Sequence, residues 1–135
     1  MYHVALGVAP EDDQLRDKVE AIAGLPQASE SVRVTVVHFH DGETPIEEVP
    51  VVAEALELLD GAGLSREVHD TDRRNASRGL VETAEDLDVD LLCIGGRHRS
   101  PAGKLQLKTG AQEVVLRAAV PVLVAGDVES REPRT

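Results

Sequence analysis

The chain has 135 residues, a length that suits a single domain able to bury a core without disulfides or structural metals. Its 25 acidic and 14 basic residues give a formal net charge of −11, which argues against nonspecific nucleic-acid binding, because that needs a broad basic surface. A single cysteine excludes an internal disulfide framework and no apolar run has membrane-spanning length, so we expect a cytoplasmic protein with no membrane partner.

The acidity has a second interpretation, which is adaptation to concentrated salt. Only three lysines are present, arginine is preferred to lysine, and the aromatic residues are one Phe and one Tyr. A strong net charge keeps proteins apart in solution, and halophiles use it for that purpose. We therefore hypothesise a salt-adapted host; thermal unfolding at decreasing salt concentration should then show a sharp loss of stability.

The first part of the chain alternates between strand and helix patterns. His3–Val8 is a short, mostly apolar strand that ends at Ala9-Pro10, and Asp12 or Asp13 is placed to cap the helix that follows. In this helix the apolar side chains fall at helical spacing: Leu15, Val19, Ile22 and Ala23. Ser31–Phe39 is rich in β-branched residues and is predicted as the second strand.

The same alternation continues through the middle of the chain. A polar, proline-containing loop over 40–50 leads to a helix over Val51–Leu59, and Leu64–His69 is a weak third strand. The pattern then predicts a helix over Arg74–Leu87. Leu91–Gly95 is a continuous apolar run, as expected of a strand that is buried on both faces.

The last part is predicted as a loop over Gly95–Lys108, a helix over Gly110–Ala118 and a strand over Val120–Ala125. The domain then covers residues 1–126, and the polar tail 127–135 is expected to be disordered. Strands that alternate with helices indicate an α/β protein with a parallel sheet covered on both faces. Ligands of such sheets bind at the carboxyl ends of the strands, where the loops after the first and fourth strands would meet.

The loop after the fourth strand lies in a basic segment. Leu91–Gln112 contains no acidic residue and carries four cationic side chains and a histidine: Arg97, His98, Arg99, Lys104 and Lys108. A basic, glycine-containing loop between a strand and a helix is where an α/β protein would hold an anion. The alternative is a set of solvated charges attracted to the acidic remainder of the chain. Thr109 and Gln112 have the spacing of a capping box at the start of the helix.

This order of elements, together with the run around the fourth and fifth strands, resembles the universal stress protein family over nearly the whole chain. The matching residues are Asp90, Leu91, Leu92, Ile94, Gly95, Val114, Val115, Pro121, Val122, Leu123 and Val124. The resemblance implies a single-domain, Rossmann-like α/β fold of the adenine nucleotide alpha hydrolase type, with a five-stranded parallel sheet of order 3-2-1-4-5. It also implies a homodimer, for which we expect pairing through the edge strand Val122–Ala125.

ATP-binding members of that family carry Gly-x-x-Gly, nine residues and then Gly-(Ser/Thr), with an Asp at the end of the first strand. In this chain Gly95 and Thr109 match that motif, whereas His98 and Lys108 replace two glycines and Ala9 replaces the Asp. The candidate nucleotide or anion site therefore consists of these residues and two arginines: Ala9, Gly95, Arg97, His98, Arg99, Lys108 and Thr109. We expect weak or no ATP binding, with an ATP- or AMP-binding switch as the alternative.

The other reactive residues are given structural roles. His38 and His40 share one strand face without an evident third metal ligand, and Cys93 lies in an apolar run as a buried, inert thiol. The chain has no nucleophile, metalloprotease or Walker motif, so we expect no enzyme activity and no metal, and rank a weak nucleotide phosphohydrolase last. The resemblance then implies a stress-response protein that works by binding and signalling.

Overall fold

A computed structural model describes residues 1–9, 12, 14–39, 45–71 and 76–126, without the side chains of Phe39 and Arg99. His40 and the predicted disordered tail 127–135 lie outside the described residues. Within the described part, no helix is long and apolar enough to cross a bilayer.

A five-stranded sheet with the order β3-β2-β1-β4-β7 forms the centre of the molecule, and every neighbouring pair is parallel. Its strands are β1 (Tyr2–Val8), β2 (Val32–Phe39), β3 (Ser65–Thr71), β4 (Leu91–Ile94) and β7 (Val122–Val124). Because β7 is the fifth strand of this sheet in chain order, the expected order 3-2-1-4-5 is confirmed. The order reverses between β1 and β4, and this places a switch point at their carboxyl ends.

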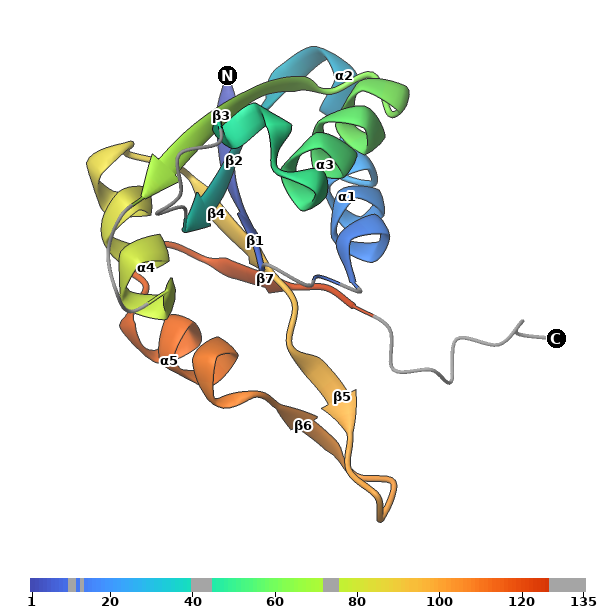
Figure 1. Cartoon of the computed structure of the whole chain (residues 1–135), viewed down its shortest axis with the longest axis vertical. Helices are drawn as coiled ribbons and strands as arrows, with labels where there is room; N and C mark the ends of the chain where they lie inside the picture. The colour runs from blue at the N-terminus through green and yellow to red at the C-terminus, as the bar shows by residue number, and fades with distance from the viewer. Residues whose placement is uncertain (10–11, 13, 40–44, 72–75, 127–135) are drawn as a thin grey trace, which may run out of the picture.

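Helices cover both faces of the sheet, as Figure 1 shows, with α1 and α3 on one side and α4 and α5 on the other. Their bounds are α1 (Leu15–Ala23), α3 (Pro50–Gly61), α4 (Ala76–Asp86) and α5 (Thr109–Arg117). Two further short elements are the helix α2 (Ala28–Ser31) and the 3-10 turn η1 (Ile46–Glu48). The short elements were absent from the sequence prediction, which began the second strand at Ser31.

The core follows from the alternation of side chains along β1. Val4 and Leu6 are fully buried among the residues of α1 and α3, whereas Ala5 is fully buried on the opposite face with Leu80 of α4 and Val114 of α5. Burying one such aliphatic side chain contributes about 1.5–3 kcal/mol. Two separate apolar clusters therefore hold the helices against the two faces and fix the strand ends at which a ligand would bind.

The basic segment after β4 is an antiparallel hairpin and not the predicted loop. Its strands are β5 (Arg97–Arg99) and β6 (Leu105–Leu107), in which Arg97 lies opposite Leu107. Gly103, at a φ of 87°, lies in the turn, and Ser100 closes it through backbone bonds to Gly103 and Lys104. Figure 1 shows the hairpin projecting away from the sheet and its helices.

The amino end of the sheet holds a buried polar cluster around His3. The ring nitrogen Nδ1 lies 3.1 Å from Nη2 of Arg33, and Nε2 lies 2.6 Å from Oγ1 of Thr35. Because the guanidinium only donates hydrogen bonds, Nδ1 is the acceptor, and the neutral ring carries its proton on Nε2. The hydroxyl of Thr35 in turn donates to Oε1 of Glu67 at 3.0 Å.

Burial lowers the pKa of His3, and the Arg33 charge lowers it further against the opposing effect of Glu67 and Asp90. Below its ordinary pKa of 6.5 the unfolded chain binds a proton here that the folded protein resists, so this contribution to stability is lost as the pH falls. We expect the free energy of unfolding to decrease as the pH falls through the range below about 6.5. Urea titrations across that range should give a shallower pH dependence for His3→Gln, and an unchanged slope would contradict this role.

Candidate functional site

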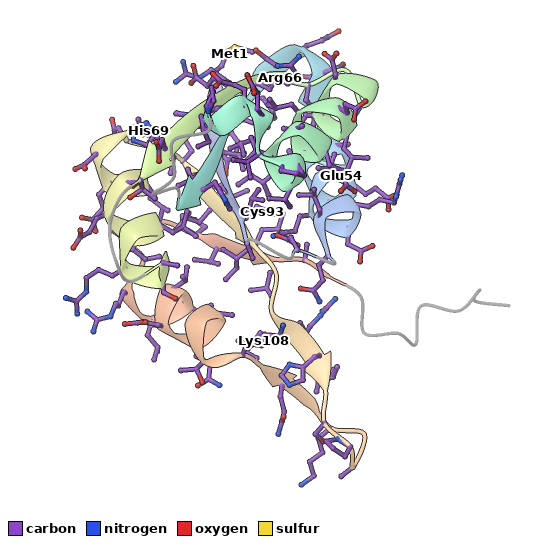
Figure 2. The ribbon with its side chains drawn as sticks, in the orientation of Figure 1. Met1, Glu54, Arg66, His69, Cys93 and Lys108 are labelled. Atoms are coloured by element: carbon purple, nitrogen blue, oxygen red, sulfur yellow. The ribbon has the colours of Figure 1, made fainter. Side chains whose placement is uncertain are left out.

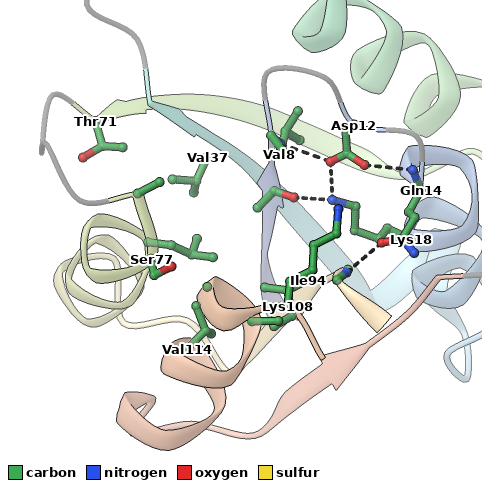
Figure 3. Close-up of a pocket in the computed structure, with 18 residues that line it drawn as sticks. Val8, Asp12, Gln14, Lys18, Val37, Thr71, Ser77, Ile94, Lys108 and Val114 are labelled. Atoms are coloured by element: carbon green, nitrogen blue, oxygen red, sulfur yellow. Dashed lines mark hydrogen bonds and ion pairs between the residues drawn. The ribbon is translucent and has the colours of Figure 1, made fainter. Parts of the chain in front are cut away.

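A cavity of about 360 Å³ opens at the carboxyl ends of β1 and β4, between the first turns of α4 and α5 (Figure 3). Its lining is mostly apolar, with Val37, Leu80, Ile94 and Val114 among the larger side chains. The backbone at its edge is glycine-rich: Gly7, Gly95, Gly96 and Gly110. Volume and lining are in the range of sites that bind small molecules.

A buried ion pair forms one wall of this cavity. Lys18 of α1 and Asp12 pair through Nζ and Oδ2, and each side chain is 4% exposed. Nζ also donates to the carbonyl oxygen of Gly7 at 2.7 Å, so the lysine ties α1 to the end of β1. Asp12 accepts the N–H groups of Ala9 at 3.1 Å and Gln14 at 3.0 Å. The pair stabilises the connection from β1 to α1.

The prediction that Asp12 or Asp13 caps the first helix is corrected here. The N-cap residue of α1 is Gln14, and it makes no side-chain capping bond. Asp12 lies two residues earlier, and its carboxylate is drawn back toward Ala9 and Lys18. Asp13 lies outside the described residues.

The Gln14 side chain joins α1 to the segment that follows β4. Its Oε1 accepts the N–H of Gly96 at 2.7 Å, and its Nε2 donates to the carbonyl oxygen of Arg97 at 2.9 Å. The amide fits because two neighbours are glycines: a Cβ at Gly95 or Gly126 would collide with it. Gly95 therefore gives room to Gln14 as well as lining the cavity.

Gly96 allows the close approach of α5 to the end of β4. Its φ is 102°, and a Cβ at this position would lie 2.7 Å from the Cβ of Ala111. Its carbonyl oxygen accepts the N–H of Lys108 at 2.9 Å, which joins the two ends of the hairpin. The first turn of α5 consequently faces the cavity, with Gly110 and Ala111 in its lining.

The structure brings three of the predicted site residues to the cavity and leaves others outside it. Ala9, Gly95 and Lys108 line it. Arg97 donates from Nη2 to the carbonyl oxygen of Gly126 at 2.8 Å, and Nδ1 of His98 lies 3.3 Å from the carbonyl oxygen of Gly96. Neither they nor Thr109 belong to the cavity lining, and the side chain of Arg99 lies outside the described part.

The capping box predicted at Thr109 is not formed. The N-cap residue of α5 is Lys108, with extended backbone, and no side chain caps the helix. Gln112 instead donates from Nε2 to the carbonyl oxygen of Leu107 at 2.7 Å. Thr109 is thus the first helical residue, one position later than a cap requires.

The remaining reactive side chains have structural surroundings. Cys93 is fully buried, which raises the pKa of its thiol to about 12, and Figure 2 places it within the sheet. This agrees with an inert, buried cysteine. Nδ1 of His38 lies 2.8 Å from the carbonyl oxygen of Val8, and the described residues contain no cluster of three side chains able to hold a metal.

The residues of the cavity wall that the sequence analysis missed as site residues include Gln14, Lys18 and Gly96. The sequence held one signal for Lys18. It is one of the chain's three lysines, and it lies on the same buried stripe of the helix as Leu15 and Ile22. A lysine on an apolar stripe needs a buried partner, and two aspartates, Asp12 and Asp13, precede this helix.

The fold and the pocket define a doubly wound α/β protein with a ligand-sized cavity at its switch point. The family model described as "Universal stress protein family" matches residues 4–126. The chain belongs to the universal stress protein family.

Individual relatives agree with this assignment. A universal stress protein of Mycolicibacterium smegmatis is 37% identical over 65 residues, which are 48% of this chain and 50% of that protein, so the match spans about half the relative's length. A universal stress protein structure from Archaeoglobus fulgidus is 26% identical with a TM-score of 0.72, over 93% of this chain and 98% of that one.

A universal stress protein crystallised in complex with cAMP has the same fold, with a TM-score of 0.65 and 23% identity. The alignment covers 91% of this chain and 94% of that one.

Proposed function

We propose that this chain acts in the stress response by binding an adenine nucleotide without turning it over. The observation that carries this proposal is the cavity at the switch point, where Val37, Leu80 and Ile94 supply apolar walls beside the glycine backbone. A purine ring suits such walls, and the first turn of α5 supplies N–H groups for an attached anion. A protein of the same fold was crystallised with cAMP, which supports an adenine nucleotide as the ligand. The proposal itself rests on the pocket of this chain.

ATP is expected to bind weakly, because the segment that would wrap its outer phosphates is the projecting hairpin. Among the residues of 97–108 whose side chains the structure describes, Lys108 at the base of β6 is the one that lines the cavity. Phosphates beyond the first would extend toward solvent and toward a chain of net charge −11. A nucleotide with fewer charges gains the same contacts with less repulsion.

The proposal of binding without turnover is supported by the state of Asp12, the one carboxylate among the described residues of the lining. Its Oδ2 accepts from Lys18 and from the N–H of Ala9, and its Oδ1 accepts from the N–H of Gln14. A carboxylate held in this way is a poor general base, because proton transfer would require it to leave these partners.

Calorimetric titration with adenosine, AMP and ATP, at low and high salt, tests the proposal directly. We expect AMP to bind and ATP to bind more weakly, with no release of phosphate over hours of incubation. Absence of binding by all three compounds would overturn the assignment of an adenine nucleotide, and steady turnover would overturn the assignment as a binding protein.

We further propose that the protein works as a homodimer through the open edge of β7. In the ladder with β4, the N–H of Ala125 and the carbonyl of Pro121 point inward, so those of Val122 and Val124 point outward. Unpaired edges favour pairing with another chain. Nearby in the chain, α5 exposes two apolar side chains, Val115 at 41% and Leu116 at 84%.

Val124→Pro is expected to convert the dimer to a monomer with the fold retained, because proline removes an outward N–H and leaves the β4 ladder intact. Light scattering measures the mass, and circular dichroism checks the fold. Leu116→Glu is the second variant. The Leu116 side chain is 84% exposed, so its replacement should leave the monomer stable, whereas a glutamate buried in the dimer interface would disrupt the dimer. A monomeric wild-type protein would contradict the proposed assembly.

A further inference from the structure

The hairpin formed by β5 and β6 has little of its own chain to pack against. Among the described strands, β5 and β6 pair only with each other, and each has three residues. Figure 1 shows them projecting away from the sheet and its helices. A two-stranded hairpin is marginally stable in water at best, and it gains stability by packing against a helix or a further strand. The projecting hairpin is therefore suited to a surface that another molecule supplies.

One face of the hairpin is apolar. Side chains alternate along β6, so Leu105 and Leu107 lie on one face and Gln106 lies on the other. Leu107, at the base, packs against the core cluster between the sheet and the helices α4 and α5. Leu105, further out on the same face, is 54% exposed. The apolar face thus begins in the core of this chain and continues beyond it, on the side of the sheet that α5 covers.

The hairpin leaves the sheet at its open edge. Nη2 of Arg97 donates to the carbonyl oxygen of Gly126 at 2.8 Å, so the base of β5 lies beside the carboxyl end of the edge strand β7. In Figure 1 the hairpin lies beyond β7, on the side away from β3. A chain that pairs with the edge of β7 therefore meets the hairpin as well.

A second copy of the chain presents an apolar helix turn at this place. A two-fold axis at the edge makes the two β7 strands antiparallel, so the carboxyl end of one sheet lies beside the amino end of the other. Since α5 links β4 to the parallel strand β7, its last turn lies at the amino end of its own sheet. In each copy that turn exposes Val115 at 41% and Leu116 at 84%.

The charges of the two surfaces are complementary. The hairpin belongs to the segment Leu91–Gln112, which has no acidic residue and contributes Lys104 next to Leu105. At the amino end of the sheet, the end of α4 and the turn into β4 expose Glu85 and Asp88. Opposite charges across an interface favour one register of the two partners and disfavour others. A second copy therefore offers the hairpin both an apolar contact and an opposite charge.

We propose that the β5–β6 hairpin is a dimerisation arm, in which Leu105 of one protomer packs against the partner's Val115 and the partner's Leu116. This rests on the proposed homodimer and adds a second contact to the pairing of the β7 strands. The two-fold axis repeats the contact, so two arms enclose the paired strands from opposite ends. Three of the large apolar side chains that the described chain exposes are thereby covered: Leu105, Val115 and Leu116.

Leu105→Ser tests the arm through the dissociation constant of the dimer, measured by sedimentation over a dilution series. We expect the dimer to bind about tenfold more weakly or worse, because each dimer loses two apolar contacts. Gln106→Ser is the matched control, since it changes the next residue of the same strand on the opposite face. Equal effects of Leu105→Ser and Gln106→Ser on the dissociation constant would overturn the arm.

Cross-linking tests the contact itself. A Leu105→Cys protein is mixed with a Leu116→Cys protein, the subunits are allowed to exchange, and mild oxidation is applied. We expect a disulfide-linked dimer on a non-reducing gel that neither variant gives alone, and Cys93 does not compete because it is fully buried. A mixture of Gln106→Cys and Leu116→Cys is the control. A dimeric mixture without the Leu105→Cys to Leu116→Cys cross-link would contradict the proposed contact.

Val124→Pro separates the arm from the pairing of the β7 strands. If Val124→Pro remains a dimer that Leu105→Ser dissociates, the arm stands and the pairing through β7 is wrong. If Val124→Pro gives a monomer while Leu105→Ser leaves the dissociation constant unchanged, the pairing through β7 stands and the arm is wrong. A monomeric wild-type protein would overturn both, and the nucleotide titrations would still decide the ligand.

Discussion

Replacing Asp12 by alanine is expected to destabilise the protein by about 3–5 kcal/mol, because it leaves the Lys18 charge buried without its counter-ion. Both side chains are 4% exposed, so water in the adjoining cavity compensates only in part for the lost carboxylate. The N–H groups of Ala9 and Gln14 also lose their acceptor. Guanidinium unfolding monitored by circular dichroism gives the change in the free energy of unfolding.

A surface pair provides the matched control for this variant. Asp60 and Arg66 lie 3.6 Å apart with side chains that are 71% and 37% exposed, and Asp60→Ala should cost less than about 1 kcal/mol. The double variant Asp12→Ala/Lys18→Met should recover a large part of the loss, since it removes the unpaired charge. A cost for Asp12→Ala no larger than that of the surface control would show that the buried pair contributes little.

Gly96→Ala is expected to destabilise the protein by about 2–6 kcal/mol, from two effects that add. A φ of 102° is a conformation that an L side chain rarely adopts, at a cost of about 1–3 kcal/mol. The new methyl group would also lie 2.7 Å from the Cβ of Ala111. This clash would push α5 away from β4, at a cost of about 1–3 kcal/mol in the free energy of unfolding. Thermal unfolding should show a clear drop in Tm, and ligand binding should weaken with it.

Gly61→Ala is the control for the chemical change. Gly61 is the last residue of α3, and a Cβ there meets nothing within 4 Å. Alanine should therefore leave the stability unchanged or raise it by up to about 1 kcal/mol. If Gly96→Ala and Gly61→Ala were equally stable, α5 would be able to move away from Gly96 at little cost, and the close approach would not fix the shape of the pocket.

The strands and helices were predictable because their side chains carry strong periodic signals. Leu91–Ile94 is apolar throughout and is buried on both faces, as its sequence indicates. The order of the strands came from the family resemblance, because periodicity alone does not say which strands are neighbours. The prediction of the hairpin failed for a physical reason: Arg97–Arg99 has no β-branched or apolar residue, and Leu105–Leu107 is too short for alternation to be recognised.

The site was predictable in its location and only partly in its residues. The basic residues pointed to the end of β4, and Lys108 and Gly95 do line the cavity there. The hairpin carries Arg97 and His98 away from it, which no count of charges along the chain could show. Gln14 and Lys18 reach the cavity because α1 packs beside the end of β1, and contacts of that kind depend on tertiary packing rather than on a motif.

The hydrogen bond from the N–H of Lys108 to the carbonyl oxygen of Gly96 has a consequence for engineering the chain. It brings the two bases of the hairpin together at 2.9 Å, so the residues between them can be exchanged without moving β4 or α5. Residues 98–106 are thus a natural insertion point, where a short turn, an epitope or a fluorescent domain could replace the native sequence, with Leu107 kept because it packs against the core. The pocket would remain on the retained side of the junction.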